Sequence, residues 1–382
     1  MGHRGIAQPS KSATDADFAR RLIDWQRRHG RHDLPWQGTT DAYRIWLSEI
    51  MLQQTQVATV IPYYRTFLER FPDVAALAAA DIDDVLRLWA GLGYYSRARN
   101  LHRAAIAVVE VHGGQFPRER EVLEALPGIG RSTAAAIAAF AFGAREAILD
   151  GNVKRVLARH FAVAGFPGES RVMAQLWSVA ESLLPARGIE RYTQALMDLG
   201  ATVCTRAPEC SRCPVRTTCR ALAADAIKDY PAPKPKKAVP AREVRMLLLE
   251  DSNRLLLERR PATGIWGGLF SFPEFSLDDD AVEACRLRLG HEIKVIREMS
   301  VLVHSFTHYT LRIHPVIARL QRKPRASGQG AMDPGAMAWL TREEVRDGAV
   351  PAPVKVLLGL AGGSQSAPIT SRGSAVARKS VR

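Results

Sequence analysis

Two hydrophobic periodicities divide the chain. Up to about residue 224, apolar side chains recur at every third or fourth position, which is typical of amphipathic helices. Phe18, Leu22 and Trp25 illustrate this pattern, because they share one face of a helix that Gly30 ends. From about residue 242 onward, short runs of alternating apolar and polar residues indicate strands.

The first periodicity predicts a series of helices and the second a mixture of strands and helices. Helices are expected over residues 15–29, 41–54, 57–71, 81–89, 131–142, 172–184 and 191–202, with a basic helix from residue 153. Strands are expected over 244–250, 254–258, 311–320 and 336–340, and helices over 278–289 and 342–345. The first two strands read as a hairpin around residues 251–253. The chain is therefore predicted to be multidomain, with an all-α unit over 15–224 and a separate α+β unit over 242–361.

Segments of biased composition flank and separate these units. Residues 225–241 contain four prolines and a run of lysines, which is typical of a semi-rigid linker. Residues 1–14 are polar, and residues 362–382 are rich in glycine, serine and basic side chains. Both ends are expected to be disordered tails.

The stretch 126–152 combines a glycine turn with two successive helix starts. Gly128 and Gly130 permit a tight turn and close backbone approach, and an alanine-rich helix follows. The unpaired N–H groups at such a helix start form a site for an anion. Asp150 precedes the next helix and places a carboxylate at its start. Alone, the turn could be an ordinary connection and Asp150 only an N-cap.

Glu49 lies in the middle of the predicted helix 41–54. Its helix neighbours are apolar on nearly every face: Ile45, Trp46, Leu47, Ile50, Met51 and Leu52. Such a helix is expected to be buried, and burial raises the pKa of a carboxyl group. A carboxyl that holds a proton near neutrality suits general acid catalysis. The alternative is a buried glutamate that is paired to an arginine or a backbone group.

Residues 91–100, GLGYYSRARN, place two tyrosines beside two arginines after a glycine turn. Tyr94 and Arg97 in this string suit stacking on bases and contact with phosphates. The alternative is that the tyrosines pack on the core.

Four of the five cysteines lie within sixteen residues. They are Cys204, Cys210, Cys213 and Cys219. This clustering is a strong signature of a metal site and does not make a disulfide scaffold. Zinc and a [4Fe–4S] cluster both accept four thiolates, and the spacing alone does not separate them.

Charge and composition narrow the choice of partner. The formal net charge is +14 and the pI is about 9.9, which favours a polyanion such as nucleic acid. A basic protein without such a partner is the alternative. No apolar run reaches the length of a membrane span, and the N-terminus has no apolar signal core. We therefore expect a cytoplasmic protein without a membrane partner.

Several strings resemble the adenine DNA glycosylase (MutY) family of base-excision enzymes. The matching strings are SEIMLQQTQV at 48–57, GLGYYSRARN at 91–100, LPGIG at 126–130 and LDGNVKRVLAR at 149–159. The resemblance implies a helix-hairpin-helix over 126–142 and a [4Fe–4S] cluster in the loop 204–219. The string GIWGGLFSFP at 264–273 resembles the segment before a Nudix box, but the box itself is absent. A Nudix-like domain without hydrolase activity is therefore implied for 242–361.

The resemblance also implies roles for individual residues. Glu49 would protonate an adenine flipped out of the duplex, Asp150 would stabilise the sugar cation, and Asn152 would orient Asp150 or a water. DNA contacts are implied for Gln53, Gln54, Tyr94, Arg97, Gly128, Gly130, Ser132 and Lys154. Recognition of 8-oxoguanine is implied for Phe306, Thr307 and His308. The four clustered cysteines would be the cluster ligands.

The implied activity is hydrolysis of the N-glycosidic bond of adenine opposite 8-oxoguanine or guanine in double-stranded DNA, by a monomer. Relatives with lyase activity carry a lysine at the position of Ser132, so a monofunctional enzyme or at most a weak lyase is expected. Two departures stand out. The first cysteine gap has five residues where the family has six, and Thr307 replaces a serine.

Two other interpretations stay open. One is an endonuclease III-like glycosylase for oxidised pyrimidines, against which the Nudix-like unit, the Phe-Thr-His loop and Ser132 argue. The other is a non-enzymatic module that binds damaged DNA, against which the buried Glu49 argues. The missing box disfavours a Nudix pyrophosphatase.

Overall fold

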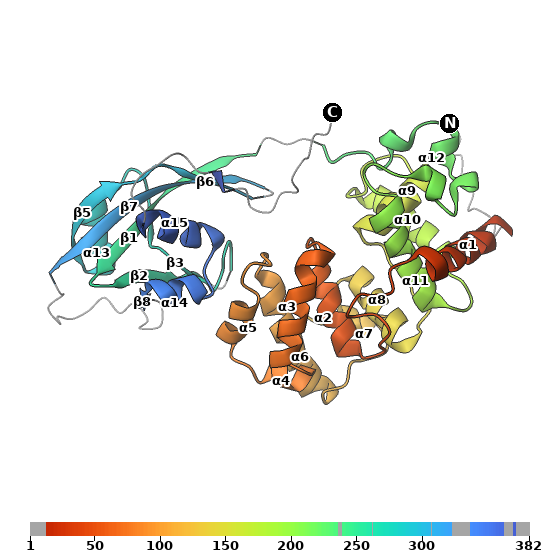
Figure 1. Cartoon of the computed structure of the whole chain (residues 1–382), viewed down its shortest axis with the longest axis horizontal. Coiled ribbons are helices and arrows are strands. Elements are labelled where there is room, and N and C mark those ends of the chain that lie inside the picture. Colours follow the sequence, from red (N-terminus) through yellow and green to blue (C-terminus); the bar gives the residue numbers. More distant parts are fainter. Residues whose placement is uncertain are drawn as a thin grey trace, which may run out of the picture. The chain divides into compact units, whose positions relative to one another are not determined.

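The computed structural model describes residues 13–235, 239–261, 263–306, 308–322, 337–362 and 370–371. Its internal contacts divide the chain into two compact units (Figure 1). The first comprises Met1–Ala80 and Arg99–Lys236, and the second comprises Asp81–Ala98 and Lys237–Arg382.

The first unit is helical, as the periodicity predicts. Its helices are α1 (Ala13–His29), α2 (Ala42–Leu52), α3 (Val57–Arg70), α4 (Val74–Ala78), α6 (Ser96–His112), α7 (Arg120–Glu124), α8 (Arg131–Phe142), α9 (Gly151–His160), α10 (Ser170–Ser182), α11 (Ile189–Asp198) and α12 (Arg220–Ala223). The first three residues of α6 belong to the second unit. The helices predicted for this unit are confirmed. Helix α6 is long but is not among them, and α4, α7 and α12 are too short for periodicity to reveal. The prediction of a tail up to residue 14 is wrong at its end, because α1 begins at Ala13.

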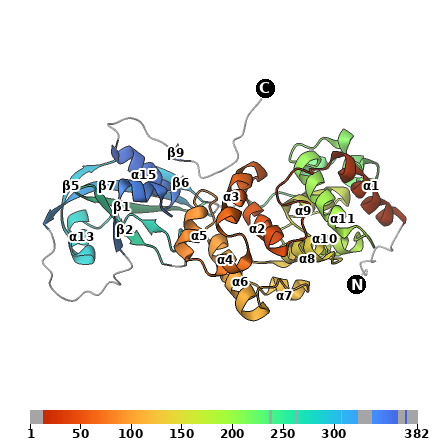
Figure 2. The ribbon, with the colours of Figure 1, turned by 60° about the horizontal axis from the view of Figure 1, so that its bottom comes forward.

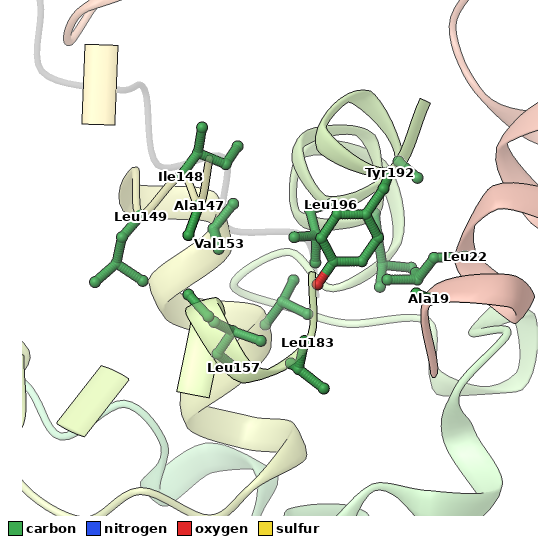
Figure 3. Packing of buried hydrophobic residues seen from close by; sticks show 14 of the residues in the cluster. Ala19, Leu22, Ala147, Ile148, Leu149, Val153, Leu157, Leu183, Tyr192 and Leu196 are labelled. Carbon is green, nitrogen blue, oxygen red and sulfur yellow. The ribbon is translucent and has the colours of Figure 1, made fainter. Parts of the chain in front are cut away.

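Helix α8 explains why the central stretch is rich in alanine. All six residues from Ala134 to Ala139 are buried, and α8 contacts both α2 and α11. Small side chains let these helices approach closely. Part of the neighbouring core, with Leu22 of α1, Leu157 of α9 and Tyr192 of α11, is drawn in Figure 3. This packing fixes the helices that carry the predicted site.

The second unit contains a mixed sheet. Its helices are α5 (Ile82–Leu88), α13 (Ala281–Leu289), α14 (Arg342–Asp347) and α15 (Ala352–Gly362). Its strands are β1 (Ala241–Asp251), β2 (Arg254–Arg259), β3 (Phe270–Ser271), β4 (Glu274–Phe275), β5 (Glu292–Glu298), β6 (Leu302–Ser305), β7 (Thr310–Arg322), β8 (Met337–Thr341) and β9 (Thr370–Ser371). The strand order is β3-β2-β1-β7-β6-β9, with β4 on β1, β5 on β7 and β8 on β2. Strands β1 and β7 are parallel.

Helices cover both faces of this sheet. Met246 and Leu248 of β1 belong to the core beneath α15, whereas Leu247 and Leu249 belong to the core beneath α13. Figure 2 shows α13 and α15 on opposite sides of the strands. This alternation along β1 follows the two-residue period of a strand. The predicted α+β class is thus refined to a layered α/β arrangement.

The sequence predicts part of this unit. The hairpin is confirmed, because Glu250 of β1 pairs with Leu255 of β2. The apolar pattern does not predict β5, whose side chains are mostly exposed, nor β6 and α15. Most of both predicted tails, residues 1–12, 363–369 and 372–382, lies outside the described residues; Thr370 and Ser371 pair with β6. Across the part of the chain that is described, no helix combines the length and apolarity that crossing a bilayer requires.

Candidate active site

Glu49 lies in the middle of α2, half-buried between the buried residues Ser48 and Ile50. Among the residues that the structure describes, none forms a hydrogen bond or ion pair with its carboxylate. Burial, and then the charge of Asp150, raises the pKa of Glu49 to about 7. The alternative of a paired glutamate is therefore wrong, and this carboxyl can hold a proton near neutral pH.

Glu49 lines a cavity of about 570 Å³ in the first unit. The loop before α2 contributes Leu34, Trp36 and Gln37 to its wall, and α11 contributes Gln194. The wall thus combines an indole and aliphatic side chains with three carboxamides, because Gln26 also lines it, and with charged side chains that include Arg31 and Glu190. This mixture suits a planar heteroaromatic group that is oriented by a few polar contacts.

Asp150 is the N-cap of α9. Its Oδ1 accepts a hydrogen bond from Val153 N at 2.8 Å, and its Oδ2 accepts one from Asn152 Nδ2 at 3.2 Å. Burial raises the pKa of Asp150, and these hydrogen bonds oppose the rise because they favour the ionised form. The interpretation of Asp150 as an N-cap is confirmed. Asp150 is more than a cap, because its charge also raises the pKa of Glu49.

Arg155 connects Asn152 to the cysteine segment. Its NH2 donates to Asn152 Oδ1 at 2.9 Å and to the Gly200 carbonyl at 2.6 Å, and its Nε donates to the Cys204 carbonyl at 2.7 Å. Gly200 belongs to a π-helical turn, Leu199–Val203. A Cβ at Gly200 would lie 2.6 Å from the Cβ of Asn152, so only glycine fits there. The start of α9 is therefore held against both the π-helical turn and Cys204.

The glycine turn before α8 is shaped by close packing. Gly128 has a φ of +77°, and a Cβ there would lie 2.6 Å from the Cβ of Asn100. Gly130 is the N-cap of α8, whose first turn carries no acidic residue. The N–H groups at this helix start therefore face no competing carboxylate of their own turn and suit an anion. Gln53, the C-cap of α2, donates to Thr133 Oγ1 at 3.4 Å and so joins α2 to this turn.

Ser132 lies in the first turn of α8 and engages the protein itself. Its Oγ accepts a hydrogen bond from Leu149 N at 2.9 Å. Because Leu149 directly precedes Asp150, this bond fixes the backbone that leads into the carboxylate. The sequence does not indicate this contact, and the DNA contact predicted for Ser132 stays a prediction.

Two residues predicted to enter the DNA have a backbone conformation that is rare for residues other than glycine. Gln54 has a φ of +59° and Tyr94 a φ of +50°. Strain of this kind concentrates at functional sites. Tyr94, which belongs to the second unit, is also exposed.

Arg97 and Lys154 differ from the exposed cations that the sequence suggests. Arg97 is buried, and its NH2 donates to the carbonyls of Leu92 and Gly93, each at 3.1 Å. Arg97 therefore supports the turn that carries Tyr94. Lys154 is half-buried, and burial lowers its pKa although the charge of Asp150 opposes this.

The four clustered cysteines line one cavity together with Arg159. Arg159 donates from NH1 to Cys204 Sγ at 3.4 Å and to the Thr205 carbonyl at 2.6 Å. Burial raises the pKa of Cys213 to about 12. Within the described ranges, no three histidine, cysteine, aspartate or glutamate side chains are placed to hold a metal ion.

In the second unit, Phe306 lies within an aromatic cluster. Its ring stacks on Tyr309 with 4.7 Å between centroids and also contacts His304 and Trp266. His308 is exposed and packs against Tyr309. Thr307, which is predicted to act with these residues, lies outside the described residues.

The structure adds residues that the sequence does not single out. Trp36, Gln37 and Gln194 line the cavity with Glu49, although the first two lie more than 150 residues from the third. No local pattern signals such a meeting. Arg155 carries a weak signal, since it lies one turn after Asp150 in the string LDGNVKR.

Two protein-family models match the chain. Residues 47–182 match the HhH-GPD superfamily base excision DNA repair protein, and residues 244–360 match the NUDIX domain. The chain is 36% identical over 304 residues to an adenine DNA glycosylase of Buchnera aphidicola subsp. Acyrthosiphon pisum, covering 79% of this chain and 87% of the relative. It is 36% identical over 422 residues to the adenine DNA glycosylase of Homo sapiens, covering 94% and 76%. Among solved structures, a thermostable thymine-DNA glycosylase aligns with a TM-score of 0.51 and 29% identity, covering 55% of this chain and 97% of that one.

Proposed function

Because the chain belongs to the adenine DNA glycosylase family and is a DNA glycosylase, we propose that it hydrolyses the N-glycosidic bond of adenine opposite 8-oxoguanine or guanine in duplex DNA. One observation carries this proposal: Glu49, whose carboxyl has no partner among the described residues, lines a cavity that is large enough to admit a base, and burial together with the charge of a second carboxylate, Asp150, raises its pKa. The two groups correspond to the acid and the anion of glycoside cleavage.

Adenine inside a duplex is out of reach of any side chain, so the nucleotide leaves the stack and enters the cavity. Gln54 and Tyr94 fill the vacated space in the duplex. Their positive φ angles, +59° and +50°, support this role, because the folded chain holds both in a strained conformation before DNA binds.

Glu49 then protonates a ring nitrogen of adenine, N7, so that the base leaves as a neutral molecule. Its raised pKa of about 7 supports this step, since an appreciable fraction holds a proton at neutral pH. Cleavage of the C–N bond leaves an oxocarbenium-like cation on the sugar. The carboxylate of Asp150 stabilises this cation, and Asn152 holds the carboxylate in place through its 3.2 Å hydrogen bond. Water then completes the hydrolysis.

The start of α8 binds a phosphate through the backbone N–H groups that follow Gly128 and Gly130 in the glycine turn. Lys154 and the net charge of +14 add attraction to the duplex. The second unit supplies recognition of 8-oxoguanine through Phe306, Thr307 and His308. The aromatic cluster around Phe306 supports this assignment, because it anchors one end of that loop.

Cys204, Cys210, Cys213 and Cys219 would hold a [4Fe–4S] cluster. The four thiols line one cavity, which supports a shared metal site, and the family resemblance selects a cluster over zinc. When bound, the cluster supplies a fixed shape to the loop 204–219. All four cysteines line the cavity despite the five-residue first gap, which supports this assignment.

We further propose a monofunctional enzyme that acts as a monomer on chromosomal DNA in the cytoplasm, in association with the nucleoid if the cell is bacterial. The hydroxyl of Ser132 is engaged with Leu149 N and offers no amine to the sugar. Abundant borohydride trapping of a protein–DNA adduct would contradict this part of the proposal.

The test is single-turnover base release on a set of duplexes, with a visible spectrum of the same sample. The proposal predicts fast release of adenine opposite 8-oxoguanine, slower release opposite guanine and none opposite thymine. Release of thymine opposite guanine, or of thymine glycol, in place of adenine would refute the substrate assignment. A colourless, iron-free and active preparation would refute the cluster alone.

A further inference from the structure

Asp198 is a completely buried carboxylate at the end of α11 that none of the proposed chemical steps uses. Its Oδ1 accepts hydrogen bonds from Arg31 Nε at 2.7 Å and from Gln194 Nε2 at 2.9 Å, and it forms an ion pair with Arg31 NH2 at 2.7 Å. Its Oδ2 accepts one from Arg31 N at 3.0 Å. A buried ion pair of this kind adds little net stability, because desolvation offsets its attraction. Its value to the protein therefore lies in the geometry that it imposes.

The geometry concerns the loop 31–37, which begins at Arg31. The Arg31 carbonyl accepts a hydrogen bond from Gln37 Nε2 at 3.1 Å, and Gln37 Oε1 accepts one from Leu34 N at 3.2 Å. Gln37 N also donates to the Leu34 carbonyl at 2.9 Å. Both ends of the loop are thus tied, through Arg31, to Asp198. Leu34, Trp36 and Gln37 of this loop line the same cavity as Glu49.

Asp198 also directly precedes the segment that packs against the start of α9, where Asp150 lies. The π-helical turn begins at the next residue, and Gly200 within it packs against Asn152 at the start of α9. Asn152 in turn donates to Asp150. Asp198 is therefore connected through Arg31 to the cavity wall and along the chain to the turn that packs against Asn152.

We propose that Asp198 is a positioning residue that acts through Arg31 to hold the loop 31–37 as the wall that captures the extruded adenine. The inference rests on the proposed function, because it identifies the cavity as the base site. The ion pair acts on capture of the base and leaves the proton transfer from Glu49 unchanged.

Capture is measured with 2-aminopurine, an isomer of adenine that becomes fluorescent when it leaves the base stack, placed opposite 8-oxoguanine. Full-length Asp198→Asn, Arg31→Lys and Gln37→Leu are compared with wild type, and DNA affinity is measured by anisotropy. Gln37→Leu cuts the far end of the same network without disturbing the buried charge. Glu283→Gln, which alters an exposed ion pair with Arg286 on α13, is the control.

We expect Asp198→Asn to reduce the fluorescence rise and to slow adenine release at saturating enzyme by roughly tenfold or more, the scale of a misplaced reacting group. Arg31→Lys should be intermediate, and Gln37→Leu should change both readouts in the same direction. DNA affinity and the pH dependence of release should keep their wild-type form. Glu49→Gln should show the opposite pattern, with full fluorescence and lost release.

The inference is overturned if Gln37→Leu and whichever of the other two variants fold give wild-type fluorescence and release. It is also overturned if the loss appears as a changed pH profile with normal fluorescence, because Asp198 would then act on the acid. Failure of the proposed function looks different. Wild-type protein would then release no adenine, while the fluorescence of the variants could still be compared.

Discussion

The middle of α2 and the start of α9 each place one carboxyl group at the site, but the two carboxyl groups differ in the hydrogen bonds that they receive. In α2, Glu49 is half-buried and receives no hydrogen bond within the described residues. At the start of α9, Asp150 receives hydrogen bonds from Val153 and Asn152. The helix interior has no free N–H groups to offer, whereas the helix start has several. Burial raises the pKa of both carboxyl groups, but only Asp150 receives hydrogen bonds that favour its ionised form, because it lies at a helix start.

The largest expected effect comes from removing either carboxyl. Glu49→Gln and Asp150→Asn should each bind DNA normally and lose at least ~100-fold in the single-turnover rate of adenine release. Glu69→Gln on the exposed side of α3 is the matched control and should act like wild type. If either site variant cleaved at the wild-type rate, the assignment of that carboxyl would be wrong.

A smaller effect is expected from loosening the support of Asp150. Arg155→Met removes the hydrogen bonds to Asn152, Gly200 and Cys204, so Asn152 loses its anchor. Adenine release should slow roughly tenfold through misplacement of the carboxylate. Arg145→Met, which removes two surface hydrogen bonds to Leu184 and Pro185, is the control. Equal rates for the two variants would show that the Asp150 side of the comparison needs no such support.

Ser132→Ala should have a milder effect than Arg155→Met. It removes the acceptor for Leu149 N, and a hydrogen bond of this kind contributes about 1 kcal/mol, which corresponds to roughly fivefold in rate. The rate of release is measured beside the affinity for DNA. A loss of affinity without a loss of rate would instead support the predicted contact of Ser132 with DNA.

The smallest effect tests whether an unpaired polar group is always kept for function. Among the described residues, neither the buried hydroxyl of Tyr192 nor the carboxyl of Glu49 has a hydrogen-bond partner, but Tyr192 lies in the core (Figure 3). Tyr192→Phe should leave activity unchanged and raise the free energy of unfolding by up to about 1 kcal/mol. Tyr43→Phe should lower it by about 1 kcal/mol, because the buried Tyr43 hydroxyl donates to the Phe71 carbonyl at 2.7 Å. Denaturant unfolding gives the free energy of unfolding of both variants. A Tyr192→Phe variant that is less stable than wild type would contradict this prediction.

The sequence predicts those features that are local. The helix ends around Gly130 and Asp150 follow from turn and capping chemistry, and the burial of α2 follows from its apolar faces. It cannot predict that Glu49 is unpaired, because that depends on what α2 meets in space. The cavity wall unites Trp36 with Gln194 across more than 150 residues, and only tertiary packing creates it.

The same limit applies to two residues with predicted DNA contacts, because each also has a contact within the protein that the sequence does not indicate. Arg97 reads as an exposed cation beside two tyrosines, but its guanidinium binds the carbonyls of the preceding turn. Ser132 reads as a surface residue at a helix start, but the segment before Asp150 passes directly over its hydroxyl. In both cases, the residue type suits a contact within the protein and a contact with DNA equally well. Only the fold shows the contact within the protein.

The pH dependence of single-turnover adenine release tests the central claim most directly. Only protonated Glu49 can act as the acid, so the rate should fall as the pH rises through about 7, and Glu49→Gln should lack this fall. At lower pH, protonation of Asp150 should reduce the rate again, since its anion is then lost. A wild-type rate that stays constant or increases from about pH 6 to about pH 8 would contradict the claim that an unpaired, protonated Glu49 drives the reaction.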